Sequence, residues 1–271
     1  MNQTESAEST RPTDRTTRRT ALVTGATTGI GAAVAERLAR QSMDLVLVAR
    51  DTARLETAAR RLHAEHSVAV LTVPMDLSQE GAPGRLAERL AGDGVEVDVL
   101  VNNAGVSLMG PVAASDPAQV RALVDLNAGA VAELTTLMLP GMVARGRGSI
   151  VNIASTGAYA PAAYVAAYAA SKAFVLSFTQ AVWAETRGTG VRVVAISPGP
   201  TDTPMNTRPA PGKRRPGDVA DTVMAALRGD GPSVVDGRRN AVQTFVFGRL
   251  LPSRTAARLT ERFMREAAGA V

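Results

Sequence analysis

The sequence predicts a single α/β domain built on a doubly wound parallel sheet of six to seven strands, with helices on both faces. The first observation is that short apolar runs alternate with helical patterns along most of the chain. Strands separated by helices form βαβ units, in which neighbouring strands are parallel. The second observation is the size. A chain of 271 residues can bury one large core, and no linker or internal repeat divides it.

The predicted strands are mostly apolar, as expected for strands that are buried on both faces. They are Ala21–Thr24, Leu45–Val48, Val68–Val73, Val97–Val101, Ser149–Ile153 and Val191–Ile196, with Ser233–Val235 as a candidate seventh strand. The helical patterns between them have apolar residues at helical spacing. They are Ile30–Arg40, Thr52–Glu65, Gly84–Ala91, Ala118–Val143 and Tyr164–Thr186.

The two ends of the chain differ from its middle. Residues 1–18 are polar and contain no apolar run, so we expect a disordered tail and a cytoplasmic protein. Residues 19–271 form the domain, and 204–271 are expected to supply a substrate lid and a C-terminal helical region. Within it, Asn240–Met264 mixes apolar residues with arginines. Such a segment can cover a pocket, lie on a membrane or pack against another subunit, and packing is favoured.

Composition excludes several classes of function. Cysteine is absent, and the two histidines, His63 and His66, lie three residues apart among arginines, where a solvated face is expected. We therefore predict no metal site. The net charge is +5, but aromatic residues make up 3% of the chain, which argues against nucleic acid as a partner.

One stretch resembles a membrane span by its hydropathy. Between Arg147 and Glu185 the only charged residue is Lys172. Pro161 and several polar residues interrupt the stretch, so a buried strand followed by a buried helix is the better interpretation, and no transmembrane span is predicted.

A glycine-rich turn follows the first predicted strand. Thr24-Gly25-Ala26-Thr27-Thr28-Gly29-Ile30-Gly31 leads directly into the first predicted helix. Glycines in such a turn let the backbone approach a pyrophosphate, whose charge the helix N-terminus stabilises. Glycine also serves ordinary strand-to-helix turns, but the position of this one favours a nucleotide site.

Four further motifs follow in order. Asn102-Asn103-Ala104-Gly105 comes after the fourth predicted strand, Ser155 after the fifth, and Tyr168-Ala-Ala-Ser-Lys172 thirteen residues later. Pro198-Gly199-Pro200-Thr201-Asp202-Thr203 comes after the sixth. With the spacing Thr-Gly-x-x-x-Gly-x-Gly of the glycine turn, this set resembles the short-chain dehydrogenase/reductase family over about residues 19 to 205. The resemblance implies a Rossmann-like fold and an oxidoreductase, and it weakens after Thr203.

The end of the second predicted strand bears on the choice of cofactor. An acidic residue at Ala49 would bind the adenosine ribose and select NAD, whereas Arg50 can pair with the 2′-phosphate of NADP. Arg50 can also be a solvated charge before a helix capped by Asp51, but the missing acid and the present base agree on NADP(H). Asp76-Leu77 looks like the family's contact with adenine, although Asp76 can also cap the next helix. The predicted cofactor residues are Gly25, Thr27, Thr28, Gly29, Ile30, Gly31, Arg50, Asp76, Leu77, Asn103, Ala104, Gly105, Tyr168, Lys172, Pro198, Gly199, Thr201 and Thr203.

The resemblance assigns the chemistry to Asn127, Ser155, Tyr168 and Lys172. Tyr168 and Lys172 are i and i+4 in a predicted helix, so their side chains share one face. The Lys172 ammonium and the positive nicotinamide ring are expected to lower the pKa of the Tyr168 phenol, which then protonates a carbonyl oxygen as hydride arrives. Ser155 would bind the substrate oxygen and Lys172 the nicotinamide ribose. The backbone of Asn127 would hold a water that connects Lys172 to solvent.

A lone Tyr-x-x-x-Lys in a helix is usually exposed surface. Lys172, however, is one of only two lysines and lies in the least charged stretch of the chain. A buried lysine needs a polar partner, which Tyr168 and the ribose provide.

The substrate is the least defined part of the prediction. By analogy with the family, Ser107, Tyr159, Tyr164 and Met205 are expected to line a pocket for a small to medium, mostly apolar ketone or secondary alcohol. The basic stretch Arg208–Arg215 can grip an anionic group, such as a phosphopantetheine-linked acyl chain, or can be a solvated loop. The family assembles through the two long helices, so a homodimer or homotetramer is expected.

The leading hypothesis is therefore an NADP-dependent carbonyl reductase (ketoreductase), or the matching alcohol dehydrogenase. One alternative is an acyl-carrier- or CoA-linked 3-oxoacyl reductase. Another is a non-catalytic nucleotide-sensing Rossmann protein, but such proteins tend to lose the tyrosine or the lysine. A double-bond reductase usually has six residues between its tyrosine and lysine, whereas Tyr168 and Lys172 have three between them and Tyr164 and Lys172 have seven.

Overall fold

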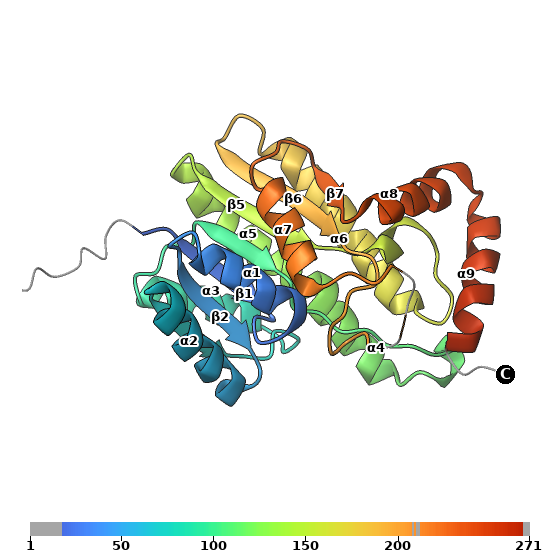
Figure 1. Ribbon diagram of the computed structural model, residues 1–271, viewed down its shortest axis with the longest axis horizontal. Helices are drawn as coiled ribbons and strands as arrows, with labels where there is room; N and C mark the ends of the chain where they lie inside the picture. Colours follow the sequence, from blue (N-terminus) through green and yellow to red (C-terminus); the bar gives the residue numbers. More distant parts are fainter. Residues whose placement is uncertain (1–17, 208, 210–211, 268–271) are drawn as a thin grey trace, which may run out of the picture.

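The computed structural model describes residues 18–207, 209 and 212–267, so the predicted tail 1–18 lies almost wholly outside the described residues. The described residues contain seven strands in one sheet, in the order β3-β2-β1-β4-β5-β6-β7, and all neighbours are parallel (Figure 1). The strands are β1 (Thr20–Thr24), β2 (Asp44–Ala49), β3 (Val70–Pro74), β4 (Val99–Asn102), β5 (Gly148–Ile153), β6 (Val191–Ser197) and β7 (Ser233–Val235).

Helices cover both faces of the sheet. They are α1 (Gly29–Ala39), α2 (Thr52–His66), α3 (Ala82–Gly92), α4 (Pro117–Val124), α5 (Ala130–Ala144), α6 (Ala166–Glu185), α7 (Pro216–Ala226), α8 (Arg238–Phe245) and α9 (Ser253–Ala267). Neighbouring residues of a strand point to opposite faces. Ala21 and Val23 of β1 therefore pack in one core with residues of α1, α2 and α7, while Leu22 packs in a second core with residues of α3, α5 and α6.

These cores confirm the predicted single doubly wound α/β domain with its Rossmann-like order of strands. The candidate strand Ser233–Val235 is the seventh strand and pairs with the end of β6. Two predicted strands begin later than expected. Before β3, the backbone N–H of Ala69 donates to the Asp44 carboxylate, and before β4, Asp98 accepts from the N–H of Thr20.

Two predicted helices differ from the observed ones. The pattern Ala118–Val143 forms α4 and α5, joined by a π-helical turn at Asp125–Gly129. The predicted helix Tyr164–Thr186 is α6. It begins at Ala166 rather than at Tyr164, because Tyr164 has a left-handed backbone with φ of +62°. Such a backbone conformation cannot continue a right-handed helix.

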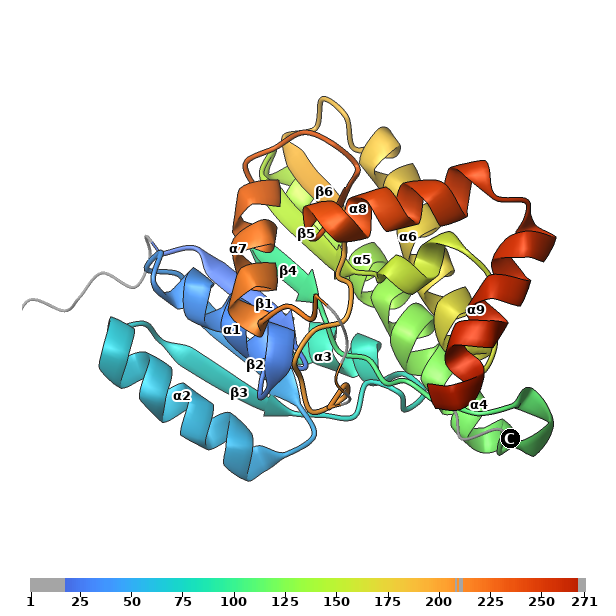
Figure 2. The same cartoon turned by 45° about the vertical axis from the view of Figure 1, so that its right-hand side comes forward.

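The segment 204–271 contains several elements with different places in the fold. Helix α7 packs beside α1 on one face of the sheet, and β7 extends the sheet. Helices α8 and α9, with a π turn between them at Val246–Leu250, form an arm at the end of the molecule far from α2 (Figure 1 and Figure 2).

Among the described residues, one helix is long and apolar enough to cross a membrane, namely the continuous run Pro117–Ala144. Core helices pass the same test. Leu134 and Met142 of this run are buried in the second core, and 39% of the apolar stretch is buried inside the protein. The stretch between Arg147 and Glu185 forms β5 and α6, as predicted.

Candidate active site

A cavity of about 510 Å³ opens at the carboxyl ends of the central strands, on both sides of the point where β1 and β4 meet. This is the crevice in which doubly wound sheets bind ligands, because the chain leaves β1 and β4 in opposite directions there. All the predicted cofactor residues except Gly31 line this cavity, as do Ser155 and Met205. Seven separate stretches of the sequence therefore meet at one site.

The glycine turn has the conformation that its sequence requires. Gly25 and Gly29 have φ of +64° and +57°, a left-handed region that favours glycine. Gly31 does not line the cavity. A side-chain carbon at Gly31 would overlap the Gly25 carbonyl oxygen and the Asn103 amide, so its role is close packing. Thr28 precedes α1 without a side-chain hydrogen bond to it, and the first turn of α1 has no acidic residue. The N-terminus of α1 thus offers its N–H groups and partial positive charge to an anion.

The Asn-Asn-Ala-Gly motif ties the end of β4 to the glycine turn. The Thr24 hydroxyl accepts from the N–H groups of Asn103 and Ala104, both at 2.9 Å. The Asn103 side chain donates to the carbonyl oxygens of Thr24 and Gly25, at 2.9 and 3.2 Å. These bonds hold the backbone of both motifs in a fixed relation at the cavity wall.

Arg50 and Asp76 lie at the end of the cavity near β2 and β3. Burial raises the pKa of Asp76, but hydrogen bonds from the Ser78 N–H and hydroxyl, at 3.0 and 2.7 Å, and the charge of Arg50 outweigh it, so the pKa lies below its ordinary value. Asp76 does not cap the next helix, because Gly81 occupies that position. Asp51 caps α2 as predicted and accepts from the N–H of Arg54 at 3.0 Å.

Lys172 is 5% exposed, and its ammonium group donates to the carbonyl oxygen of Ile153 at 2.8 Å. Burial lowers the pKa of Lys172 to about 8. Burial likewise raises the pKa of Tyr168, and a hydrogen bond with Ser155 lowers it in part. The protein's own groups thus do not give the lowered Tyr168 pKa that we expected from Lys172. That expectation also included the positive nicotinamide ring, so it stays a prediction for the complex.

Asn127 lies in the π turn between α4 and α5 and is fully buried. Its side-chain oxygen accepts from the N–H of Val106, and its amide donates to the Val106 carbonyl oxygen, both at 2.9 Å. The amide also donates to the Ser171 hydroxyl at 3.2 Å. Asn127 does not line the cavity. Its side chain holds the loop after β4 against α6, and π turns often occur at functional sites.

The segment after β6 closes the cavity on its other side. Pro198, Gly199, Thr201 and Thr203 all line it. The base of this segment is fixed by Arg214, whose guanidinium lies 2.6 Å from the fully buried carboxylate of Asp236.

Of the four predicted substrate residues, only Met205 lines the cavity. Ser107 is exposed on the loop after β4. The Tyr159 hydroxyl is 3.3 Å from that of Ser197, and Tyr164 contacts Arg265 of α9. The two tyrosines are thus held by neighbours within the protein rather than facing the cavity.

Sequence reasoning missed several residues of the cavity wall. Arg54 is the most informative, because it lies in the first turn of α2 and adds a second arginine to the wall that Arg50 lines, where it pairs with Asp51 at 3.2 Å. Apolar wall residues such as Leu126 carry no chemical signature in the sequence. The wall residues not predicted are Val48, Ala49, Asp51, Arg54, Met75, Leu126, Ile153 and Ala154.

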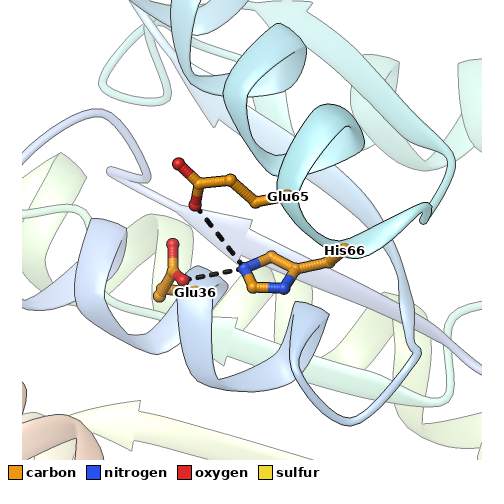
Figure 3. A group of neighbouring side chains, drawn as sticks. All are labelled: Glu36, Glu65 and His66. Atoms are coloured by element: carbon orange, nitrogen blue, oxygen red, sulfur yellow. Dashed lines mark hydrogen bonds and ion pairs between the residues drawn. The ribbon is translucent and has the colours of Figure 1, made fainter.

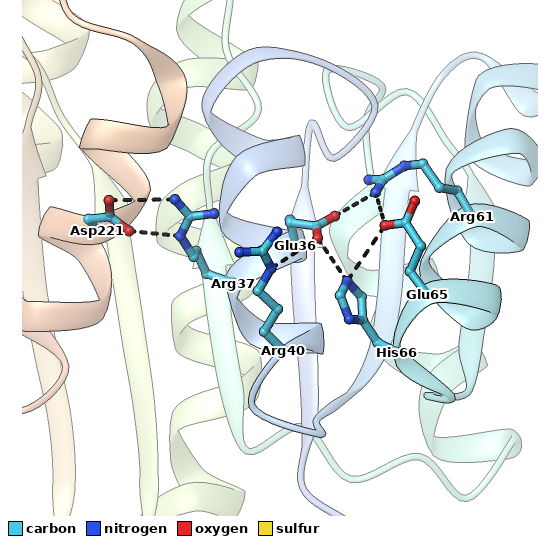
Figure 4. A network of polar contacts seen from close by, with 7 residues as sticks. All are labelled: Glu36, Arg37, Arg40, Arg61, Glu65, His66 and Asp221. Carbon is cyan, nitrogen blue, oxygen red and sulfur yellow. Dashed lines mark hydrogen bonds and ion pairs between the residues drawn. The ribbon is translucent and has the colours of Figure 1, made fainter.

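Among the described residues, one group of side chains has the composition of a metal site, namely Glu36, Glu65 and His66 between α1 and α2 (Figure 3). The Arg61 guanidinium already lies 2.6 Å from Glu36 and 2.7 Å from Glu65, in the place that a cation would take (Figure 4). The expected solvated face is wrong for His66. Its side chain is 15% exposed, and its Nε2 lies 2.8 Å from the Glu36 carboxylate.

Comparison with known proteins agrees with this geometry. The family model described as short chain dehydrogenase matches residues 19–213. An uncharacterized oxidoreductase of Staphylococcus saprophyticus is 36% identical over 211 residues, which cover 77% of this chain and 90% of that protein. The ketoacyl reductase HetN of a Nostoc species is 33% identical over 229 residues, which cover 81% of this chain and 78% of that protein. The solved short-chain dehydrogenase of Sphingobium yanoikuyae in complex with NADPH has a TM-score of 0.78 at 33% identity, over 83% of this chain and 90% of that one.

Proposed function

The chain belongs to the short-chain dehydrogenase family, and from this premise we propose that it transfers hydride between NADP(H) and a ketone or secondary alcohol. The substrate would be a small to medium, mostly apolar molecule. The observation that carries the proposal is that Ser155, Tyr168 and Lys172 line the same cavity as the glycine turn. A proton donor for an oxygen atom and a site for a dinucleotide are thus adjacent.

The cavity fits a nicotinamide dinucleotide. Its volume of about 510 Å³ lies in the range of cofactor sites, and the open N-terminus of α1 suits the pyrophosphate. When bound, the nicotinamide ring supplies or accepts the hydride. Arg50 would hold the 2′-phosphate, Lys172 the nicotinamide ribose, and Thr201 and Thr203 the carboxamide. NADP rather than NAD is supported by Arg50 and Arg54 at the wall and by the absence of an acid at Ala49.

Tyr168 would give its phenolic proton to the carbonyl oxygen of the substrate in reduction and take a proton back in oxidation. Ser155, which is hydrogen-bonded to Tyr168, would bind the same oxygen and hold it within reach of the phenol. In the complex with the positive nicotinamide ring, Lys172, which is protonated below its pKa of about 8, would favour the phenolate. Asn127 would keep the loop after β4 in place behind Lys172. Leu126, Ile153 and Met205 give the wall the apolar surface that an apolar substrate needs.

The test is the Tyr168→Phe variant in a screen of ketones with NADPH as reductant. The wild type should oxidise NADPH with at least one ketone. Tyr168→Phe should lose that turnover by about 100-fold or more, since general acid catalysis contributes about 10²–10⁴-fold, while it keeps the affinity for NADPH. Turnover that survives in Tyr168→Phe would rule out the assigned acid.

A second candidate substrate class is a 3-oxoacyl group linked to coenzyme A or an acyl carrier. It is supported by the likeness to the Nostoc ketoacyl reductase and by the exposed Arg215, whose side chain is 84% accessible at the base of the loop after β6. Arg208 of the same basic stretch lies outside the described residues. One screen that compares free ketones with 3-oxoacyl thioesters separates the two substrate classes. An enzyme specific for the carrier should reduce the thioesters and lose activity on the free ketones.

We also propose a cytoplasmic homodimer or homotetramer that assembles through α5 and α6. Leu137 and Phe174 on these helices are 43% and 45% exposed, which supports an interface there. We further propose that the segment after Thr203 covers the bound substrate.

A further inference from the structure

Helix α8 buries polar side chains and exposes apolar ones. Asn240 and Thr244, one turn apart, are buried against the protein. Val242 and Phe245 lie on the other side of the helix and are 66% and 58% exposed. A helix on the surface of a globular protein usually buries its apolar side chains. The outward face of α8 is therefore built to contact something else.

The apolar character continues along the arm that α8 and α9 form, which we define as residues 238–265. Leu250 in the π turn is 62% exposed, and Phe263 on α9 is 70% exposed. Four large apolar side chains are thus more than half exposed on one short segment. Single exposed apolar residues are ordinary, whereas a group of them marks an interaction surface.

The charge of the arm indicates which kind of partner it contacts. It contains seven arginines against one glutamate, and Glu266 in the last turn of α9 adds a second acid. The two helices and the turn between them therefore carry a net charge of +5, as much as the whole chain. Arg249, Arg258 and Arg262 are exposed. The complementary partner is therefore an anionic surface that also accepts apolar side chains. A bilayer that contains anionic phospholipids has both properties, since apolar side chains enter the interface and arginines contact the headgroups.

The same charge argues against a second copy of the chain on this surface. In a two-fold symmetric interface a surface patch meets its own copy, so the arginines of one arm would face those of the other. Two acids, Glu261 and Glu266, stand against seven arginines in the two helices, and Glu261 is already paired with Arg265.

We propose that the arm, residues 238–265, is a peripheral docking surface for membranes that contain anionic phospholipids. The docking lies in the plane of the interface and does not involve the apolar helix Pro117–Ala144. Thr260 of α9 donates to the carbonyl oxygen of Pro161 at 2.8 Å, so the arm is attached to the loop after β5. If the proposed function holds, the arm would also bring an apolar substrate dissolved in the membrane close to the active site.

The test is flotation of the full-length protein with vesicles. The probes are vesicles of phosphatidylcholine with phosphatidylglycerol and vesicles of phosphatidylcholine alone. The wild type should float with the anionic vesicles and be released by salt. Arg249→Gln/Arg258→Gln/Arg262→Gln should bind about 100-fold more weakly, because each arginine near an anionic surface contributes a factor of about five. Val242→Ser/Phe245→Ser should also lose binding.

A matched control removes the same charge elsewhere. Arg60, Arg89 and Arg121 are exposed on other helices, so the triple change of these residues to Gln should leave flotation unaltered. NADPH affinity, measured for each variant, shows that the fold is intact and is independent of flotation. Equal loss in the control, equal binding to neutral vesicles, or no flotation at all would overturn the proposal. So would a dimer of the wild type that becomes a monomer in Val242→Ser/Phe245→Ser without any flotation, because the surface would then join two copies.

Discussion

Arg50 is the residue on which the proposed preference for NADP(H) depends. It lies at the cavity wall beside Asp76, whose pKa its charge helps to lower, and Ala49 before it carries no acid. In the proposed complex the site would offer a cation to the 2′ position of the adenosine ribose and no acceptor for a free hydroxyl at Ala49. A phosphate there gains a charge-assisted contact, whereas a hydroxyl gains little.

We therefore expect Arg50→Ala to weaken NADPH binding by about 10- to 100-fold, since a hydrogen bond to a charged group contributes about 1.5–3 kcal/mol. The affinity for NADH should stay the same. Fluorescence titration of each nucleotide measures both, with Arg60→Ala as a control for loss of charge alone. Stronger binding of NADH than of NADPH by the wild type would contradict this account of Arg50.

The burial of Lys172 predicts that the free energy of unfolding changes with pH, independently of catalysis. Its pKa is lowered from 10.5 to about 8 because burial disfavours the charged form. Below pH 8 the folded protein must keep a charge buried. Between pH 8 and 10.5 the unfolded chain binds the proton more strongly than the folded one, so the free energy of unfolding rises with pH. The gain is at most about 3 kcal/mol.

Urea unfolding of the wild type and Lys172→Met at pH 7.5 and at pH 9.5 isolates this contribution, because the other groups that titrate cancel in the difference. The stability of the wild type relative to Lys172→Met should increase with pH. A difference that stays constant, or that falls, would mean that Lys172 is not buried as described.

At the scale of elements, α1 and α2 are joined by a polar network centred on Glu36 (Figure 4). Arg61 and His66 of α2 bind its two carboxylate oxygens, and Arg40 pairs with it along α1. Burial raises the pKa of Glu36, but the hydrogen bonds and charges of Arg61 and His66 outweigh it and hold the pKa at about 2. This network fixes α2 beside the helix that follows the glycine turn.

The depressed pKa predicts acid sensitivity. The stabilising effect of the Glu36 carboxylate is present above its ordinary pKa of 4.5 and is lost as the pH falls from 4.5 towards 2, by at most about 3 kcal/mol. Glu36→Gln should therefore be less stable than the wild type at pH 7 and nearly equal to it at pH 2.5, as measured by urea unfolding. Glu88→Gln, at an exposed position on α3, serves as the control and should match the wild type at both pH values.

The elements also show what the sequence can and cannot predict. The six apolar runs predict the strands well, because burial on both faces leaves a strong apolar signal. The π turn at Asp125–Gly129 could not be predicted, since α4, the π turn and α5 continue one helical pattern. The late start of α6 depends on the left-handed backbone of Tyr164, a residue whose type does not favour that conformation.

In the candidate site, too, some residues could be predicted from the sequence and others could not. Motif residues that touch the cavity through the backbone or a polar group were predictable, because dinucleotide chemistry requires them at the ends of particular strands. Tyr159 and Tyr164 were placed in the substrate pocket by analogy, but contacts with Ser197 and with Arg265 of α9 set their positions. Contacts between segments so distant in the sequence leave no local pattern.

At the scale of the whole molecule, the glycine turn joins the two halves of the sheet. Gly31 lies against the Gly25 carbonyl and the Asn103 side chain, so β1, α1 and the loop after β4 meet without room for a methyl group. The cavity forms only while these three segments keep their relation. Cofactor binding and overall stability should therefore depend on the same contact.

NADPH at about 100 times its dissociation constant should stabilise the wild type by about 2.7 kcal/mol. For a chain of this size, that raises the melting temperature by about 5–10 °C. Gly31→Ala should lower the melting temperature of the ligand-free protein by several degrees, because overpacking costs about 1–3 kcal/mol, and should remove most of the shift with NADPH. Gly92→Ala is the matched control, since no atom lies within 4 Å of the added carbon on α3, and it should keep the full shift. If Gly31→Ala keeps the full shift as well, the close contact at the glycine turn is not what shapes the cofactor site.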